Sequence, residues 1–172
     1  LFQPNDYYPD HKSYLYALAD AMKAEYEGIA KAGFIIQIDS PDLALGRHVL
    51  FKDKSDHEFV SMVGLHIEAL NHVLEEIPAE QLRLHVCWGN YQGPHHCDIE
   101  MKEILPAVLK AKPQALSFEG SNPRHGHEWT VFRNAKIPEE KILIPGVLDS
   151  TTNFVEHPEL VCERICRFAD IV

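Results

Sequence analysis

The sequence has no long uninterrupted apolar run. None of its 172 residues belongs to a stretch of eighteen or more uncharged apolar residues, and no basic segment followed by an apolar one opens the chain. A membrane-spanning helix needs about 20 consecutive apolar residues, and a secretory leader needs that basic-then-apolar order. We therefore expect a cytoplasmic protein without a membrane partner.

Positive charge is also scarce. The chain has 16 Lys and Arg against 26 Asp and Glu, a net charge of -10, and its basic residues form no stripe. Proteins that bind nucleic acids carry clustered positive charge to neutralise phosphates, so this balance argues against a nucleic-acid partner. A small-molecule substrate is the expected partner instead.

Cysteine is infrequent and unevenly distributed. Four Cys stand beside 11 His, which fits metal binding or reactive thiols in a reducing compartment better than a disulfide framework. Cys162 and Cys166 lie one turn apart in a segment with helical periodicity, and we expect them to be packing residues on an outer helix.

Apolar residues alternate between helical and strand patterns along the chain. Spacings of three and four predict helices, and short apolar runs that end at Gly, Pro or Ser predict buried strands. The predicted helices cover 10–31, 57–77, 98–109, 128–134 and 157–171, with Asp98 as the N-cap of the third. The predicted strands cover 34–39, 82–87, 115–119 and 142–149, the first buried on both faces. Strands that are each followed by a helix indicate an α/β fold with a parallel sheet of right-handed units.

A polar residue stands at the C-terminal end of every predicted strand. These residues are Asp39, Cys87, Glu119 and Asp149. In barrels and open parallel sheets the loops at this end build the active site. The coincidence at four strand ends therefore favours a functional site there, with Asp39 and Asp149 as candidate catalytic carboxylates.

His85 and Cys87 are two residues apart on one strand, so their side chains project from the same face. Imidazole and thiolate are ligands that Zn²⁺ prefers, and Glu119 on the next strand would complete three protein ligands with one open position, the catalytic pattern. The metal-free interpretation is a buried Cys, a core His and a carboxylate satisfied by the amides of the following turn.

Four segments resemble a known family. They are His85-Val-Cys87-Trp-Gly-Asn, Ser117-Phe-Glu119-Gly-Ser-Asn-Pro-Arg124, Ile36-Gln-Ile-Asp39-Ser-Pro and Pro145-Gly-Val-Leu-Asp149. Together they resemble the strand ends of the catalytic domain of cobalamin-independent methionine synthases. The likeness is greatest to the shorter, single-barrel branch that includes epoxyalkane:coenzyme M transferases.

The resemblance implies a (β/α)₈ TIM barrel that binds Zn²⁺ through His85, Cys87, Glu119 and a Cys on the last strand. It implies methyl transfer from 5-methyltetrahydrofolate to the thiol of homocysteine, with Asp39 holding the amino-acid substrate. Four strand–helix units are half of such a barrel of about 250 residues. We therefore expect one partial barrel domain, residues 1–172, from the C-terminal half of a longer protein and without the last strand.

One segment departs from the family. Methionine synthases place a proton-donating His after the strand that corresponds to 142–149, where this chain has Ser150-Thr151-Thr152. This difference leaves the protonation route open.

The identity of the thiol is open as well. Asp39 would suit the amino group of homocysteine, whereas Arg124 would suit the sulfonate of coenzyme M, or would pair with a loop acid. Trp88 and Tyr91 would line a substrate pocket or cover the strand end. A metal-free ligand-binding half-barrel is the third alternative.

Three further residues have metal-binding interpretations. Cys97 would supply a fourth ligand beside Cys87, but the sequence favours a half-buried thiol near a helix start over this interpretation. His125 and His127 form an H-x-H pair in a loop, and we expect both to be exposed.

Overall fold

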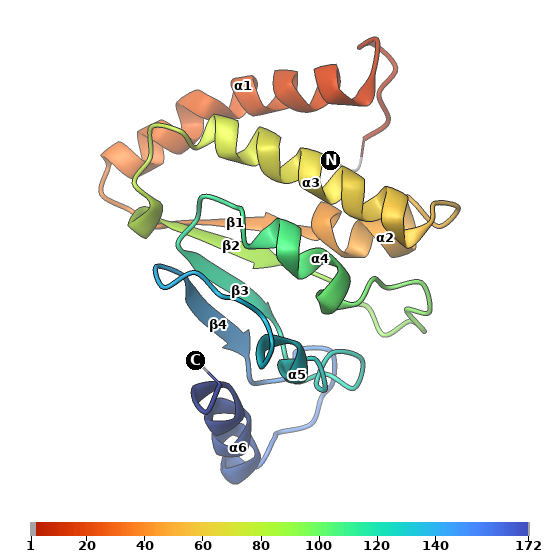
Figure 1. The fold of residues 1–172 in the computed structure, drawn as a ribbon, viewed down its shortest axis with the longest axis vertical. Helices are drawn as coiled ribbons and strands as arrows, with labels where there is room; N and C mark the ends of the chain where they lie inside the picture. Colours follow the sequence, from red (N-terminus) through yellow and green to blue (C-terminus); the bar gives the residue numbers. More distant parts are fainter. Residues whose placement is uncertain (1–2, 172) are drawn as a thin grey trace.

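Four parallel strands form one sheet in the order β1-β2-β3-β4 in the computed structural model, which describes residues 3–171. Figure 1 shows their arrowheads directed toward one edge of the molecule. The strands are β1 Ile36–Ser40, β2 Leu82–Val86, β3 Ala115–Glu119 and β4 Ile142–Gly146. In the register, Asp39 pairs with His85, and His85 pairs with Ser117. The predicted α/β architecture with four parallel strands is confirmed.

Helices follow the strands, as their apolar periodicity predicts. The α-helices are α1 His11–Lys31, α2 Leu45–Val49, α3 Asp56–Val73, α4 Met101–Val108, α5 Trp129–Phe132 and α6 Pro158–Ala169. Two short 3₁₀ helices, η1 Pro41–Leu43 and η2 Ala79–Gln81, precede α2 and β2. Asp10 caps α1 through the Ser13 N–H, and Ser55 and Glu58 form a capping box at α3.

Two of these helices differ from the prediction. The sequence pattern gave no sign of α2, a helix of 5 residues that is too short to show a periodicity. The prediction that Asp98 caps the next helix is wrong, because α4 begins at Met101 with Glu100 as its N-cap residue. The carboxylate of Asp98 instead contacts the ring of His95, with an Oδ2–Nδ1 distance of 2.9 Å.

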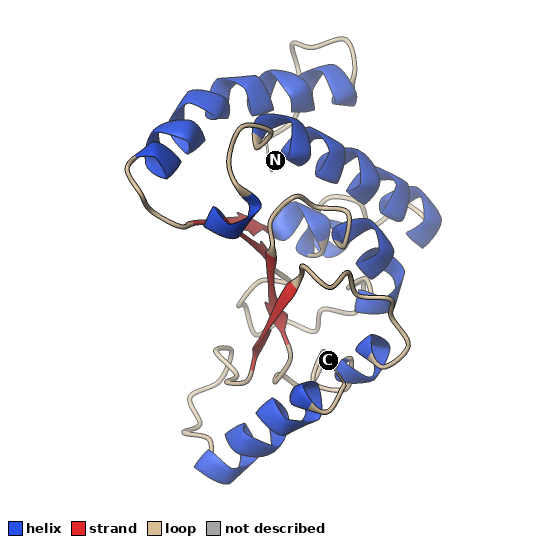
Figure 2. Ribbon diagram, turned by 60° about the vertical axis from the view of Figure 1, so that its left-hand side comes forward, coloured by secondary structure: helices blue, strands red, loops and turns tan. Residues whose placement is uncertain are grey.

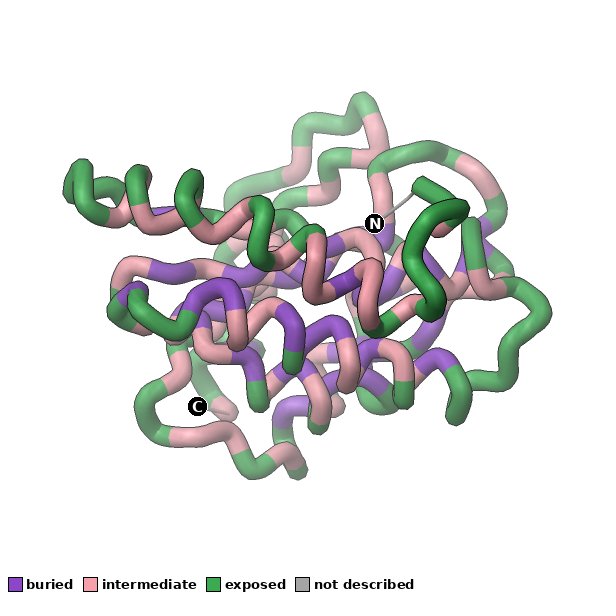
Figure 3. The backbone as a smooth tube through the Cα atoms, turned by 90° about the horizontal axis from the view of Figure 1, so that it is seen from above, coloured by how far each residue is buried: buried purple, intermediate pink, exposed green. Residues whose placement is uncertain are grey.

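The hydrophobic core lies on one face of the sheet. Alternate strand residues such as Leu84, Val86 and Phe118 pack there against apolar side chains of α3 and α4. Figure 2 shows the strands beside this helical layer, and Figure 3 shows buried positions concentrated along the strands and the inward sides of the helices. Gln37 and Asp39 project from the other face and are exposed, so the prediction that the first strand is buried on both faces is wrong.

The sheet does not close into a barrel. Within residues 3–171, β1 and β4 each pair with a single strand and form the two edges. The order, the parallel direction and the outer helices are consistent with half of a TIM barrel. Among the described residues, no helix combines the length and the apolar character required to cross a bilayer.

Candidate functional site

The carboxyl ends of the strands surround a cavity of about 260 Å³. The polar side chains that line it come from β1, β2 and β3 and from the loops that follow β2, β3 and β4. They are Asp39, His85, Cys87, Asn90, Ser117, Glu119, Ser121, Asn122, Asp149, Ser150 and Thr151. The structure therefore brings the four predicted strand-end residues and His85 together around one space.

Three of these residues lie within metal-binding distance of one another. One ligand atom each from Asp39, His85 and Cys87 lies within 4.8 Å of the other two. The parallel register places Asp39 beside His85, and strand alternation places Cys87 on the same face as His85. We predicted Asp39 as a catalytic and substrate-binding residue and did not consider it as a potential metal ligand, because only the pairing of β1 with β2 makes it a neighbour of His85.

The environment of His85 and Cys87 is suited to a cation. His85 Nδ1 lies 3.2 Å from Ser117 Oγ, which leaves the other ring nitrogen available to a ligand. Burial raises the pKa of the Cys87 thiol and outweighs the Gly89 N–H, which donates to the sulfur at 3.3 Å. The carboxylates of Asp39 and Glu119 raise the pKa further. A metal cation would reverse this effect, because a coordinated thiol loses its proton.

Glu119 lines the same cavity. Its Oε1 accepts a hydrogen bond from the Trp88 N–H at 3.1 Å, and its Oε2 accepts one from the side-chain amide of Asn122. Arg124 Nη2 lies 3.9 Å from Oε2. Glu119 is outside the 4.8 Å group of Asp39, His85 and Cys87, so its role as third zinc ligand stays a prediction. Asn122, which orients this carboxylate, lies in the Ser117–Arg124 segment that resembles the family, but the sequence analysis did not assign it a role.

Residues 5–172 match the family described as the cobalamin-independent synthase catalytic domain. The chain belongs to this family. Methionine synthase of Saccharolobus solfataricus (strain ATCC 35092 / DSM 1617 / JCM 11322 / P2) is 31% identical over 103 residues, which cover 58% of this chain and 27% of that protein. Methionine synthase of Saccharolobus islandicus (strain L.S.2.15 / Lassen #1) is 30% identical over 103 residues, with the same coverage.

The family inferred from the four strand-end segments is thus confirmed. Family and relatives together support an enzyme of the cobalamin-independent methionine synthase type. The aligned part of this chain spans only about a quarter, 27%, of the length of these methionine synthases.

Trp88 does not line the cavity of this synthase-family chain. Its side chain is fully buried, and its indole N–H donates to the Ile99 carbonyl at 2.9 Å. The ring packs 4.3 Å from the ring of His125, measured between centroids. Trp88 therefore acts on the site through its backbone N–H, which holds Glu119, and its predicted contact with substrate does not fit this position.

The two other predicted substrate and catalytic residues, Asp149 and Arg124, lie in different pockets. Asp149 lines the cavity, and its Oδ1 accepts hydrogen bonds from the backbone and hydroxyl of Thr151 at 2.9 and 2.7 Å. Arg124 lines an adjacent pocket of about 550 Å³ together with Tyr91, Thr152 and Phe154. Arg124 Nη2 is buried and has no hydrogen-bond partner among the described residues.

The prediction that His125 is an exposed loop residue is wrong, whereas His127 is exposed. His125 is buried between two carboxylates: Nδ1 lies 2.8 Å from Glu128 Oε2, and Nε2 lies 3.5 Å from Asp98 Oδ2. Burial by itself lowers the pKa of His125, but its interactions with Asp98 and Glu128 outweigh this effect and raise the pKa to about 9. Glu128 also accepts the Met101 N–H at 2.6 Å, so this ion pair fixes the start of α4.

The remaining cysteines lie away from Cys87. Cys162 and Cys166 are exposed on α6, so the prediction that they are packing residues is wrong. Cys97 belongs to a different group of potential metal ligands, with His48 and His96.

Proposed function

We propose that this chain carries the metal-binding part of a catalytic domain that transfers a methyl group from 5-methyltetrahydrofolate to the thiol of homocysteine, giving methionine. The observation that carries the proposal is the convergence of Asp39, His85 and Cys87 within 4.8 Å beside Glu119, in one cavity. Family membership and the methionine synthase relatives support the reaction class.

The donor set fits zinc. One imidazole, one thiolate and one carboxylate from neighbouring strands leave a position open for substrate. When bound, Zn²⁺ would hold the substrate sulfur as a thiolate at neutral pH, where a free thiol with a pKa near 8.5 is mostly protonated. We propose His85, Cys87 and Glu119 as ligands, with Asp39 as an additional or alternative carboxylate.

The surrounding residues have separate tasks. Ser117 orients the His85 ring, and Asn122 with the Trp88 N–H orients Glu119, as the outer partners of metal ligands commonly do. Where Asp39 is not a ligand, its carboxylate can bind the ammonium group of homocysteine in the same cavity. Asp149 is our candidate for proton transfer, because it lines the cavity next to Ser150 and Thr151, which replace the family's His.

The experiment is a metal and thiol titration of the 172-residue chain. Metal-free protein is titrated with Co²⁺, whose spectrum reports thiolate ligands, and then with homocysteine. We expect Cys87→Ser to abolish binding at this site and the homocysteine-dependent spectral change, while exposed Cys166→Ser leaves both intact. Methionine formation is followed in parallel, and near-normal turnover by Cys87→Ser protein without bound metal would refute the assignment.

Arg124 favours a second candidate, alkyl transfer to a thiol that carries a sulfonate, such as coenzyme M. Its Nη2 is buried and has no hydrogen-bond partner among residues 3–171, with Glu119 Oε2 3.9 Å away, and a guanidinium in that state suits an anionic oxygen. Binding of coenzyme M that exceeds binding of homocysteine, and that Arg124→Gln removes, would favour this candidate. The opposite preference, unaffected by Arg124→Gln, would favour homocysteine.

A further inference from the structure

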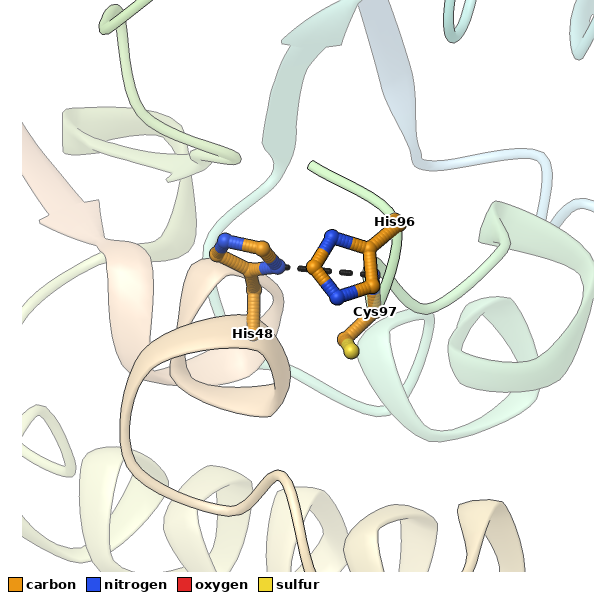
Figure 4. Close-up of side chains that lie close together, drawn as sticks. All are labelled: His48, His96 and Cys97. Carbon is orange, nitrogen blue, oxygen red and sulfur yellow. Dashed lines mark hydrogen bonds between the residues drawn. The ribbon is translucent and has the colours of Figure 1, made fainter. Parts of the chain in front are cut away.

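A second group of metal-ligating side chains lies outside the cavity described above. His48 belongs to α2, and His96 and Cys97 belong to the loop between β2 and α4. One ligand atom from each lies within 4.8 Å of the other two. Figure 4 shows the three side chains gathered between the end of α2 and this loop. None of them lines the cavity that holds Cys87.

The two ring nitrogens of His48 have different partners. Nδ1 accepts the backbone N–H of Cys97 at 3.3 Å, and Figure 4 shows this nitrogen on the side that faces His96 and Cys97. Because Nδ1 accepts a hydrogen bond, Nε2 carries the proton and donates to the Tyr91 hydroxyl at 2.6 Å. A metal-binding histidine typically donates its second N–H to such a partner, which fixes the tautomer and the ring orientation. Only the long bond to Cys97 N–H would have to be replaced by a metal.

His95 fixes the loop that carries the other two side chains. It is the only non-glycine residue with positive φ among residues 3–171, at 49°, a conformation that costs energy and is kept where its surroundings impose it. Its ring nitrogens contact two acceptors, Asp98 Oδ2 at 2.9 Å and the Tyr91 carbonyl at 3.1 Å, so His95 is not available as a ligand. The ring stacks on His48 with 5.2 Å between centroids. His95 thus determines where the next two residues stand relative to α2.

We propose that His48, His96 and Cys97 bind a second metal ion of the zinc class. Two imidazoles and one thiolate favour Zn²⁺, Co²⁺ or a similar borderline cation over Mg²⁺ or Ca²⁺, which prefer oxygen ligands. His48 is buried, and burial lowers its pKa, whereas His96 is exposed and leaves solvent access to the remaining coordination position. On binding, the Cys97 S–H bond is replaced by an S–metal bond and the proton passes to solvent.

The metal would fasten α2 to the loop that continues from the Cys87 strand end. These segments are already joined at their beginnings, because the Leu45 N–H at the start of α2 donates to the Cys87 carbonyl at 3.1 Å. A metal at His48, His96 and Cys97 would join the same two segments at a second point. The site would therefore hold the loop next to the cavity in place, and it shares no residue with the ligands that we propose for methyl transfer.

A Co²⁺ titration of the His85→Ala/Cys87→Ser double variant separates the two sites, because this variant lacks the imidazole and the thiolate of the cavity. We expect it to bind one Co²⁺ with a thiolate charge-transfer band. Adding His96→Ala should weaken that binding at least about 10-fold. Loss of a residue that only orients a metal ligand already lowers metal affinity by about 10-fold or more, and loss of a ligand should cost no less. His127→Ala, which removes another exposed loop histidine, should leave it unchanged. No Co²⁺ binding, no thiolate band, or no effect of His96→Ala would overturn the proposal.

A measurement on the unmodified chain guards against variants that fail to fold. Zn²⁺ should slow the alkylation of Cys97 by iodoacetamide, while exposed Cys162 and Cys166 react at an unchanged rate. Equal alkylation of Cys97 with and without Zn²⁺ would overturn the proposal. Loss of binding in Cys87→Ser protein alone bears only on the cavity site, so the two proposals fail separately.

Discussion

His125 should make the stability of this chain depend on pH above neutrality. Its ring is buried between Asp98 and Glu128, and its pKa is raised from 6.5 to about 9. Nε2 and Asp98 Oδ2 are 3.5 Å apart without a hydrogen bond, so attraction between charges, together with the bond to Glu128, keeps the proton on the ring. The perturbation that tests this is His125→Gln, which removes the titrating group and is similar in size.

The sign and the magnitude follow from linkage. The folded state binds the His125 proton more tightly than the unfolded state, so the contribution is complete below pH 6.5 and is lost as the pH rises through about 9. With these two pKa values, the loss between about pH 7 and 9.5 amounts to about 2 kcal/mol of unfolding free energy.

Urea denaturation across this pH interval measures the effect. The unmodified chain should lose about 2 kcal/mol more than His125→Gln between pH 7 and 9.5. His127→Gln, which alters the exposed neighbour two residues away, should follow the unmodified chain. Parallel curves for the unmodified chain and His125→Gln would refute the assignment of a buried imidazolium at this position.

Three further predictions concern single contacts. Ser55→Ala removes the capping box of α3 and should lower the unfolding free energy by about 1 kcal/mol, as measured by urea denaturation, whereas no change would show that the cap is dispensable. Asn122→Ala frees the Glu119 carboxylate and should weaken Zn²⁺ binding by about 10- to 100-fold in a competition titration, and unchanged affinity would count against Glu119 as a ligand. Gly93→Ala places a Cβ 1.7 Å from the Tyr91 ring, so the ring must move and its hydroxyl loses the hydrogen bond to His48. This change should weaken Co²⁺ binding by His48, His96 and Cys97 without affecting the cavity site.

The observed helices and strands show which elements local sequence patterns can predict. The four strands and the longer helices were predictable because apolar side chains recur at the spacing of the element that buries them. α2 was not predictable, because 5 residues do not complete enough turns to display a periodicity. Asp98 was predicted as an N-cap because acidic residues are frequent at helix starts. Its carboxylate instead contacts the His95 ring, and α4 begins three residues later.

The candidate site likewise has features that the sequence predicts and features that only the tertiary structure shows. The sequence alone determined that His85 and Cys87 share a face and that Asp39 and Glu119 stand at strand ends, because alternation along a strand and punctuation by Gly and Pro are local properties. The predicted strand 142–149 is too long, because β4 ends at Gly146 and Asp149 lies in the loop that follows. Only the tertiary structure decided that Asp39 joins His85, because this depends on the register between β1 and β2. It also decided that His48 meets Cys97 and that His125 meets Asp98, since each contact joins segments far apart in the chain. Packing and strand register determine such neighbours, and neither can be predicted from the spacing of residues along one segment.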